Sequence, residues 1–594
     1  MGKHFTLKKT DWLLLFTVAI IGCVTRQPAG KRETGFAFCK PAEPCWPTTE
    51  QWGQLNVRVH GHLEVPAFPL LACKNNPQSE ECAVAKANLK NPFADQEQSG
   101  TTQSAGMLSA WEAVPSAYAV AAQSAEDIVE AVNFARRYHI RLVVKGTGHD
   151  YLGRSTAPDS LLVWTHKMRQ VTVLDAFRPL GSPQGLAAVP AVSVEAGTRW
   201  VEAYQKVTVV NGRYVQGGGC TTVGAAGGFV QGGGFGSWSK KYGTAASNLL
   251  EAHVVTADGR LVVANAFSNA DLFWALRGGG GGTFGIVTKV TYATHPLPNY
   301  FGWVNGRITA KSDAAFKRML ERFLIFAGES LDNESWGEQF RIRGDNVVEL
   351  RLAFLGLTTK GAERVWRPFR RWIDKQNGEM ALETSYFTIP GKKLWNFDFI
   401  KANFPTEIRS DERPGSEPGS FWWTGDGDQV AVYWYAYQSR WIPSDRLSHS
   451  RAKEFANTLF RASRHSGFEI HFNKGQHGAS AAAIRRGRET AVNPKLYQAA
   501  ALIIAGASGT GYPGVKGQEP DKVEGEKAKV KVSAAMKIIR DATPGAGTYP
   551  NEADYFEPNW QQELWGTNYP KLLEIKTKYD PDHFFTCHHC VGSE

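Results

Sequence analysis

The sequence predicts an α+β protein with two domains, a glycine-rich first domain and a second domain of helices and aromatic strands. Of the 594 residues, 42% are hydrophobic and 21% are charged, which is ordinary globular usage and excludes a disordered or fibrous chain. Helical and strand patterns alternate across residues 111–296, together with three clusters of glycine. Across residues 297–540 helical patterns alternate with aromatic strands, and glycine clusters are fewer.

The net charge is mildly basic. The chain has 67 Lys and Arg against 57 Asp and Glu, a formal charge of +10. Spread over so long a chain, this bias suits an anionic ligand, but it does not predict a nucleic-acid partner.

Residues 1–23 are predicted to be a secretory signal peptide. Lysines before residue 10 precede the apolar run Trp12–Val24, which is too short to span a membrane comfortably; a short membrane anchor is the alternative. The end of this run resembles a bacterial lipobox, in which Cys23 would be lipidated. We therefore expect a secreted or extracytoplasmic protein, with a lipid anchor at Cys23 as its only membrane contact.

The cysteines fit an exported protein. The chain has eight, and setting aside Cys23 and the isolated Cys220 leaves six, for which 15 pairings exist. A short bridge such as Cys73–Cys82 is one of them. The C-x-x-C pair at 587–590 encloses two histidines and could suggest zinc, but adjacent histidines rarely converge on one ion. We therefore expect disulfides and predict no metal site.

Residues 24–110 are predicted to be an irregular extension held by disulfides, because they are polar and weakly periodic. After Trp111 the elements become clear, beginning with a helix whose first turn carries a capping box of Ser124 and Asp127. The expected elements that follow are a strand at 141–145, a strand at 191–195, a helix at 198–209, a hairpin at 250–264, a short helix capped by Ser268 and ending at 276, and a strand at 284–292.

The second domain, residues 297–540, is predicted to mix helices and strands. Helical patterns cover 313–326 and 445–463, and an aromatic strand covers 430–437. A C-terminal segment, residues 541–594, is rich in aromatic and polar residues and carries a helix at 569–579.

The three glycine clusters, at 217–219, 224–236 and 278–285, suggest a large phosphate-bearing cofactor. Glycine lets a backbone approach a ligand closely, and its N–H groups can cradle phosphate oxygens. Flexible loops are the alternative for any single cluster. The G-x-G-x-x-G match within 278–285 is not a Rossmann site, because a strand-like segment follows it instead of a helix.

Two nucleophilic side chains lie within glycine-rich segments. His149 follows Gly148, and Cys220 follows the cluster at 217–219. An imidazole and a thiolate can each bond covalently to an electrophilic cofactor carbon. The alternatives are a hydrogen-bonded turn histidine and a small buried thiol.

These segments resemble the berberine-bridge-enzyme-like branch of the vanillyl-alcohol-oxidase/PCMH flavoprotein oxidases. The resemblance runs from about Trp111 to Glu594. It implies a PCMH-type FAD-binding domain of two α+β subdomains and an antiparallel-sheet substrate domain covered by helices. The matching segments are VVKGTGHDYLGRST (143–156), GGGCTTVGAAGGFVQGGGFG (217–236), WALRGGGGGTFGIVTKVT (274–291) and NEADYFEPNWQQELWGTNYPKLLEIKTKYDP (551–581).

The resemblance implies FAD held by two covalent bonds, from His149 to the flavin 8α-methyl group and from Cys220 to flavin C6. Thr147 departs from the glycine of many relatives and leaves the histidine assignment intact. The other residues expected to bind FAD are Lys145, Gly146, Thr147, Gly148, Thr221, Thr222, Val223, Gly224, Gly228, Gly285, Ile286 and Val287.

For catalysis the resemblance implies a base that takes the substrate proton while hydride leaves for the flavin. Tyr151 matches the family's active-site tyrosine, as base or hydrogen-bond donor. Asn568 and Tyr569 match the segment beside the flavin, with packing as the alternative. The family's usual base lies on a substrate-domain strand, for which Glu469–Lys474 is the counterpart; His471 is our candidate there.

The expected activity is that of an FAD-dependent oxidase. Hydride would leave an alcohol or activated C–H of a small organic substrate (a sugar, an alcohol or a secondary metabolite), and O2 would accept the electrons to give hydrogen peroxide. The alternatives are a flavin dehydrogenase with another electron acceptor and a secreted flavin-retaining binding protein.

Overall fold

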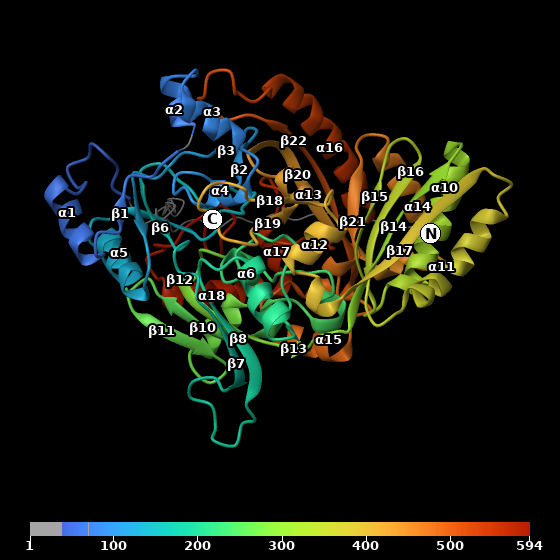
Figure 1. Ribbon diagram of the computed structural model, residues 1–594, viewed down its shortest axis with the longest axis horizontal. Coiled ribbons are helices and arrows are strands. Elements are labelled where there is room, and N and C mark those ends of the chain that lie inside the picture. Colours follow the sequence, from blue (N-terminus) through green and yellow to red (C-terminus); the bar gives the residue numbers. More distant parts are fainter. Residues whose placement is uncertain (1–37, 69) are drawn as a thin grey trace, which may run out of the picture.

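The computed structural model describes residues 38–68 and 70–594 of the chain, shown in Figure 1. The signal peptide and lipobox predicted for residues 1–23 lie outside this range. The fold is mixed α+β, as the sequence predicts, with two larger sheets in the first domain, one nine-stranded sheet in the second, and two further sheets of two strands each. Among the described residues no helix has both the length and the apolar character needed to cross a bilayer.

The first sheet has the order β1-β4-β6-β5, with β4, β6 and β5 parallel. Helix α5 connects β4 to β5 and packs on the sheet, which is the crossover that parallel strands require. Its capping box of Ser124 and Asp127 is confirmed. The elements are β1 (Leu63–Glu64), β4 (Tyr118–Ala121), α5 (Ala125–Arg137), β5 (Arg141–Lys145) and β6 (Ser160–Trp164).

The second sheet is antiparallel, with the order β11-β10-β12-β8-β7. The predicted strands and hairpin are confirmed, and the predicted helix at 198–209 is α6 followed by one π-helical segment, η1. The predicted cap of α9, the helix that ends at residue 276, is wrong, since Asn269 occupies the cap position with φ 47° and the Ser268 hydroxyl donates to the Leu180 carbonyl. The elements are β7 (Val171–Phe177), β8 (Val189–Glu195), α6 (Trp200–Tyr204), η1 (Gln205–Val210), β10 (Leu249–Val255), β11 (Leu261–Asn265), α9 (Ala270–Leu276) and β12 (Ile286–Ala293).

The third sheet has nine strands in the order β17-β14-β16-β15-β21-β22-β20-β2-β3. Four helices cover one face of this sheet and form a hydrophobic core with it (Figure 1). The opposite face is left for a cavity. The strands are β14 (Tyr300–Ala310), β15 (Trp336–Ile342), β16 (Val347–Phe354), β17 (Met380–Pro390), β20 (Val432–Pro443), β21 (Phe468–His471) and β22 (Ala499–Thr510), and the helices are α10 (Asp313–Phe326), α11 (Thr359–Asp374), α14 (Ala452–Ser463) and α16 (Lys522–Ala542).

The irregular extension predicted for residues 24–110 is wrong for the part that the structure describes. Four short helices form there, and strand β1 extends the first sheet. Strand β2 joins the large sheet, parallel to β20. The expected disulfides are present as Cys39–Cys45 and Cys73–Cys82. The new elements are α1 (Thr49–Arg58), α2 (Leu71–Asn75), α3 (Glu80–Ala87), α4 (Pro92–Gln96), β2 (Ser104–Met107) and β3 (Trp111–Glu112).

The C-terminal segment returns to the glycine clusters of the first domain. Its helices are α17 (Trp560–Trp565) and α18 (Tyr569–Tyr579), the latter as predicted. The Trp565 indole donates to the Gly278 carbonyl at 2.9 Å, and the Lys576 ammonium donates to the Thr283 carbonyl at 2.8 Å. Cys587 and Cys590 form a disulfide, which removes the alternative of a zinc site at these thiols.

Candidate active site

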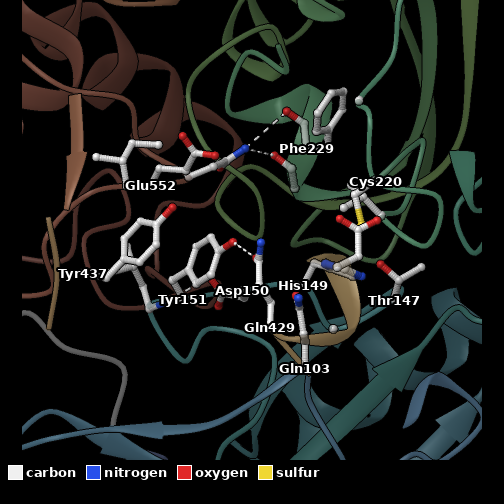
Figure 2. Close-up of a pocket in the computed structure, with 18 of the residues that line it drawn as sticks. Gln103, Thr147, His149, Asp150, Tyr151, Cys220, Phe229, Gln429, Tyr437 and Glu552 are labelled. Carbon is white, nitrogen blue, oxygen red and sulfur yellow. Dashed lines mark hydrogen bonds between the residues drawn. The ribbon is translucent and has the colours of Figure 1, made fainter. Parts of the chain in front are cut away.

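A large cavity of about 2030 Å³ lies where the two domains and the C-terminal segment meet. Its lining includes all three glycine clusters, the uncovered face of the nine-stranded sheet, and residues just before α17. Figure 2 shows His149, Cys220, Tyr151, Tyr437 and Glu552 around one part of this space. The cavity is therefore large enough for a dinucleotide and a substrate together, since drug-sized ligand sites span about 300–1,000 Å³.

The glycine-lined part of the cavity fits a cofactor that lies against the backbone. A Cβ atom added at Gly219, Gly227 or Gly228 would meet no atom within 4 Å, so these positions open onto free space. At Gly281 an added Cβ would lie 2.8 Å from Gly228 Cα, so the second and third clusters approach closely. A smooth backbone cradle of this kind suits the phosphates and ring of FAD.

His149 lies in the loop after β5 and reaches the cavity. Gly148 before it adopts φ +76°, in the left-handed region that favours glycine. The His149 Nε2 atom lies 3.1 Å from the Thr222 hydroxyl, and among the described residues Nδ1 has no hydrogen-bond partner. Burial by surrounding protein lowers the pKa of His149 to about 3, so the imidazole is neutral and can act as a nucleophile.

Cys220 is the free cysteine of the described chain. Its sulfur lies 3.7 Å from the same Thr222 hydroxyl that His149 contacts. The His149 Nε2 and Cys220 Sγ atoms are therefore at most 6.8 Å apart, the sum of the two distances. Burial, and after it the charge of Asp426, raises the pKa of the Cys220 thiol well above its usual value. The imidazole and the thiol are thus close enough for one tricyclic ring to meet both.

Tyr151 lies two residues beyond His149 and carries its hydroxyl into the cavity (Figure 2). The hydroxyl donates to Gln429 Oε1 at 2.8 Å, and the ring stacks on Tyr437 at 4.3 Å. Burial, followed by the charges of Glu552 and Cys220, raises the pKa of Tyr151 far above that of free tyrosine. Tyr151 therefore stays protonated and acts as a hydrogen-bond donor.

A carboxylate that the sequence analysis did not single out lies beside these tyrosines. Both carboxylate oxygens of Glu552 accept from the Lys474 ammonium, at 2.6 and 2.7 Å, and both residues line the cavity. The quoted segment 551–581 contains Glu552, but no spacing within it distinguishes this acid from its neighbours. Among the predicted residues, His471 also lines the cavity, with Nε2 3.3 Å from Glu469 Oε2.

The predicted cofactor residues divide into two groups. The first group lines the cavity. Its full membership is Gly146, Thr147, Gly148, His149, Cys220, Val223, Gly224, Gly228, Gly285, Ile286 and Val287. Thr221 and Thr222 are buried behind the loop. Lys145 is buried and donates to the backbone carbonyls of Gln98, Ser99 and Thr101, so it anchors the preceding segment and does not reach the cavity lining.

The structure does not bring Asn568 and Tyr569 to the cavity lining. Both lie at the start of α18, where the Asn568 carboxamide donates to the carbonyls of Ala491 and Val492. The Tyr569 hydroxyl bonds to Glu594. These are packing contacts with neighbouring segments, and neither side chain lines the cavity.

The uncovered face of the nine-stranded sheet forms the other side of the cavity. Neighbouring strands place polar side chains in two cross-strand rows, which are Asn305, Arg351, Gln339 and His471, and Arg307, Glu349, Arg341 and Glu469. Aromatic side chains, including Trp303, Phe387 and Trp423, line the same cavity. This wall can hydrogen-bond and stack against a polar organic molecule.

Comparison with known proteins finds two family models along the chain. A family model of an FAD binding domain matches residues 115–265, and one described as berberine and berberine like matches residues 548–592. FAD-linked oxidoreductase easE of Trichophyton verrucosum is 32% identical, over 94% of this chain and 90% of its own length. VAO-type flavoprotein oxidase VAO615 of Thermothelomyces thermophilus is 28% identical, over 93% and 92%.

Solved structures share the fold. The VAO-type flavoprotein MtVAO615 from Myceliophthora thermophila C1 has a TM-score of 0.76 at 25% identity, covering 94% of this chain and 97% of its own. Glucooligosaccharide oxidase from Acremonium strictum has a TM-score of 0.62 at 22% identity, covering 81% and 92%. With a relative above 30% identity along nearly its whole length, the chain belongs to the FAD-linked oxidoreductases of the vanillyl-alcohol-oxidase family, in its berberine-bridge-enzyme-like branch.

Proposed function

We propose that this enzyme is an oxidase with FAD attached through His149 and Cys220, acting on an alcohol or activated C–H of a small organic substrate. The observation that carries the proposal is the meeting of these two nucleophiles at one hydroxyl, Thr222, beside a glycine-lined cradle. When bound, FAD would supply the two-electron acceptor that no amino-acid side chain provides. O2 would be the final acceptor, giving hydrogen peroxide.

The free nitrogen of His149 supports the predicted tether. Since Nε2 is held by Thr222, Nδ1 is the nitrogen left for a bond. The FAD of Acremonium glucooligosaccharide oxidase is described as 6-S-cysteinyl and 8α-N1-histidyl, the same pair of residue types. Backbone groups from Gly146 to Gly148 and from Val223 to Gly228 would hold the dinucleotide.

Glu552 is the better candidate for the base that takes the substrate proton. Its carboxylate is ion-paired with the Lys474 ammonium, whereas Tyr151 is held protonated by its raised pKa. Lys474 holds the Glu552 carboxylate in place, and Tyr151 would donate a hydrogen bond to the substrate oxygen. His471 lies on the same wall and would contact substrate rather than remove its proton.

The polar rows of the sheet and the aromatic side chains favour a substrate with several hydrogen-bonding groups, such as a sugar, a polyol or a polar secondary metabolite. The three disulfides suit an oxidising compartment, which supports secretion or another extracytoplasmic location. The domain limits 111–296, 297–540 and 541–594 remain our proposal, with β2 and β3 added to the large sheet.

The test is a denatured, acid-precipitated sample examined for yellow colour and for flavin-bearing peptides. His149→Ala and Cys220→Ala should each leave one tether, and the double variant should release all flavin. Flavin that survives denaturation in the double variant would refute both assignments. Peroxide released per turnover separates an oxidase from a dehydrogenase, and a flavin unbleached by a broad substrate panel would favour the binding protein.

A further inference from the structure

Asp426 lies at the Cys220 side of the cavity and has no role in the proposed turnover. It belongs to α13 (Thr424–Gly427), which directly follows β19 (Phe421–Trp423). The Trp423 indole donates to the Gly219 carbonyl at 3.0 Å, which fixes this segment against the loop that carries Cys220. Both Asp426 and Cys220 line the cavity.

Asp426 is half-buried, and one oxygen of its carboxyl, Oδ2, is buried without a hydrogen-bond partner within residues 38–68 and 70–594. A buried carboxyl oxygen left unsatisfied is costly, so its retention calls for a role. Burial raises the pKa of Asp426 to about 7, opposed by hydrogen bonding with Cys220. An acid with that pKa can accept a proton near neutral pH, as an effective general base must.

The thiol of Cys220 needs such a base. Burial and the Asp426 charge keep the thiol protonated, and a thiol is a far weaker nucleophile than a thiolate. The other titratable groups that interact with the pair are Glu338 on β15, Tyr151 and Tyr204, and His149 shares the Thr222 contact. The tyrosines are themselves held protonated, and His149 is neutral with its pKa near 3. Of the two carboxyl groups, Asp426 is the one that hydrogen-bonds to the Cys220 thiol, so it is the acceptor best placed for the thiol proton.

We propose that Asp426 is the general base of cofactor attachment, taking the Cys220 thiol proton as the sulfur bonds to flavin C6. This inference rests on the proposed tether at Cys220. Overall, the Cys220 S–H bond and the flavin C6–H bond would break, and an S–C6 bond would form. The two electrons and two protons released pass to dioxygen, giving one hydrogen peroxide per linkage. Asp426 takes the sulfur proton and releases it to solvent, from which the reduced dioxygen draws its two protons, so that the proton count closes.

The experiment compares purified wild type, Asp426→Asn and Asp428→Asn by mass analysis of the Cys220 and His149 peptides after denaturation and digestion. Asp428 is an exposed carboxylate two residues away and serves as the matched control. We expect the flavin-bearing fraction of the Cys220 peptide to fall at least tenfold in Asp426→Asn while the His149 peptide keeps its flavin. Asp428→Asn should match wild type. Because hydroxide can replace the base, aerobic incubation at alkaline pH should restore the Cys220 linkage in Asp426→Asn.

The outcomes separate this inference from the proposed function. If the wild-type Cys220 peptide carries no flavin, the tether itself is absent, and both the proposed attachment at Cys220 and the proposed role of Asp426 are refuted. If wild type carries it and Asp426→Asn carries it equally, the tether stands and the role of Asp426 is overturned. Should Asp426→Asn fail to fold, Asp426→Ala is the second variant to test. Added acetate should restore flavin on its Cys220 peptide by occupying the space of the missing carboxylate, and added chloride should not. Full linkage in Asp426→Ala without acetate overturns the inference.

Discussion

Replacing Glu552 by glutamine tests the proposed catalytic base without changing the shape of the site. Glutamine keeps one oxygen for the Lys474 ammonium, which now donates to both carboxylate oxygens at 2.6 and 2.7 Å. It cannot take a proton from the substrate. A positioned general base contributes roughly 10²–10⁴-fold, so the rate of flavin bleaching by substrate should fall by that factor. This loss corresponds to about 3–5 kcal/mol of barrier.

The same change carries a smaller cost in stability. The Lys474 and Glu552 side chains are 13% and 16% exposed, so the pair is largely but not completely desolvated. Removing one partner of a fully buried pair costs about 3–5 kcal/mol, and residual solvent together with the retained oxygen should reduce this to about 1–2 kcal/mol. Glu552→Gln should therefore remain folded and keep its flavin.

The assay is anaerobic stopped-flow bleaching of the flavin by a substrate found in a panel of sugars and alcohols. Glu469→Gln is the matched control, because Glu469 is another cavity carboxylate, paired with His471. Because its polar row is proposed to bind substrate, Glu469→Gln should raise the substrate concentration needed for half-maximal bleaching, while the limiting rate of bleaching stays close to that of wild type. If folded Glu552→Gln bleaches as fast as wild type, or if Glu469→Gln is the slow variant, the assignment of the base is wrong.

Three further changes probe other parts of the site. Tyr151→Phe removes the hydrogen bond to Gln429. The barrier to flavin bleaching should rise only by about 1 kcal/mol, the contribution of one hydrogen bond, and the pH dependence of the rate should not shift. A pH profile that loses its acidic or alkaline limb would show that the Tyr151 phenol titrates during turnover. Thr222→Val removes the hydroxyl that holds Nε2 of His149, so flavin on the His149 peptide should decrease; unchanged attachment would mean that this contact does not orient the ring. Lys576→Met leaves the buried Asp580 carboxylate without its ion-pair partner, so the free energy of unfolding should fall by about 3–5 kcal/mol and the thermal unfolding midpoint should drop. An unchanged midpoint would contradict the buried ion pair.

Elements that depend on near neighbours along the chain could be predicted from the sequence. The capping box of Ser124 and Asp127, helix α10 and the hairpin of β10 and β11 all occur where the pattern indicated. In each case the decisive contacts span a few residues, so side-chain type and spacing are enough.

The N-terminal segment shows where such reasoning ends. Strand β1 has two residues and β2 has four, too short for any periodic signal. They are strands because β4 and β20 supply their hydrogen-bond partners, and β20 lies more than 300 residues along the chain from β2. The prediction that Ser268 caps α9 is wrong for a similar reason, since its hydroxyl donates to the carbonyl of Leu180, which is distant along the chain.

The sequence by itself determined the two candidate nucleophiles, His149 and Cys220, and the glycine-rich loops around them, because flexible backbone and reactive side chains occur together in single segments. Only the tertiary structure decided which acids join them. Asp426 and Glu552 come from segments that topology folds back onto the cavity, while Asn568 and Tyr569 turn into packing contacts at the start of α18. Convergence of distant side chains depends on how sheets and loops pack in three dimensions, and residue spacing along the chain does not carry that information.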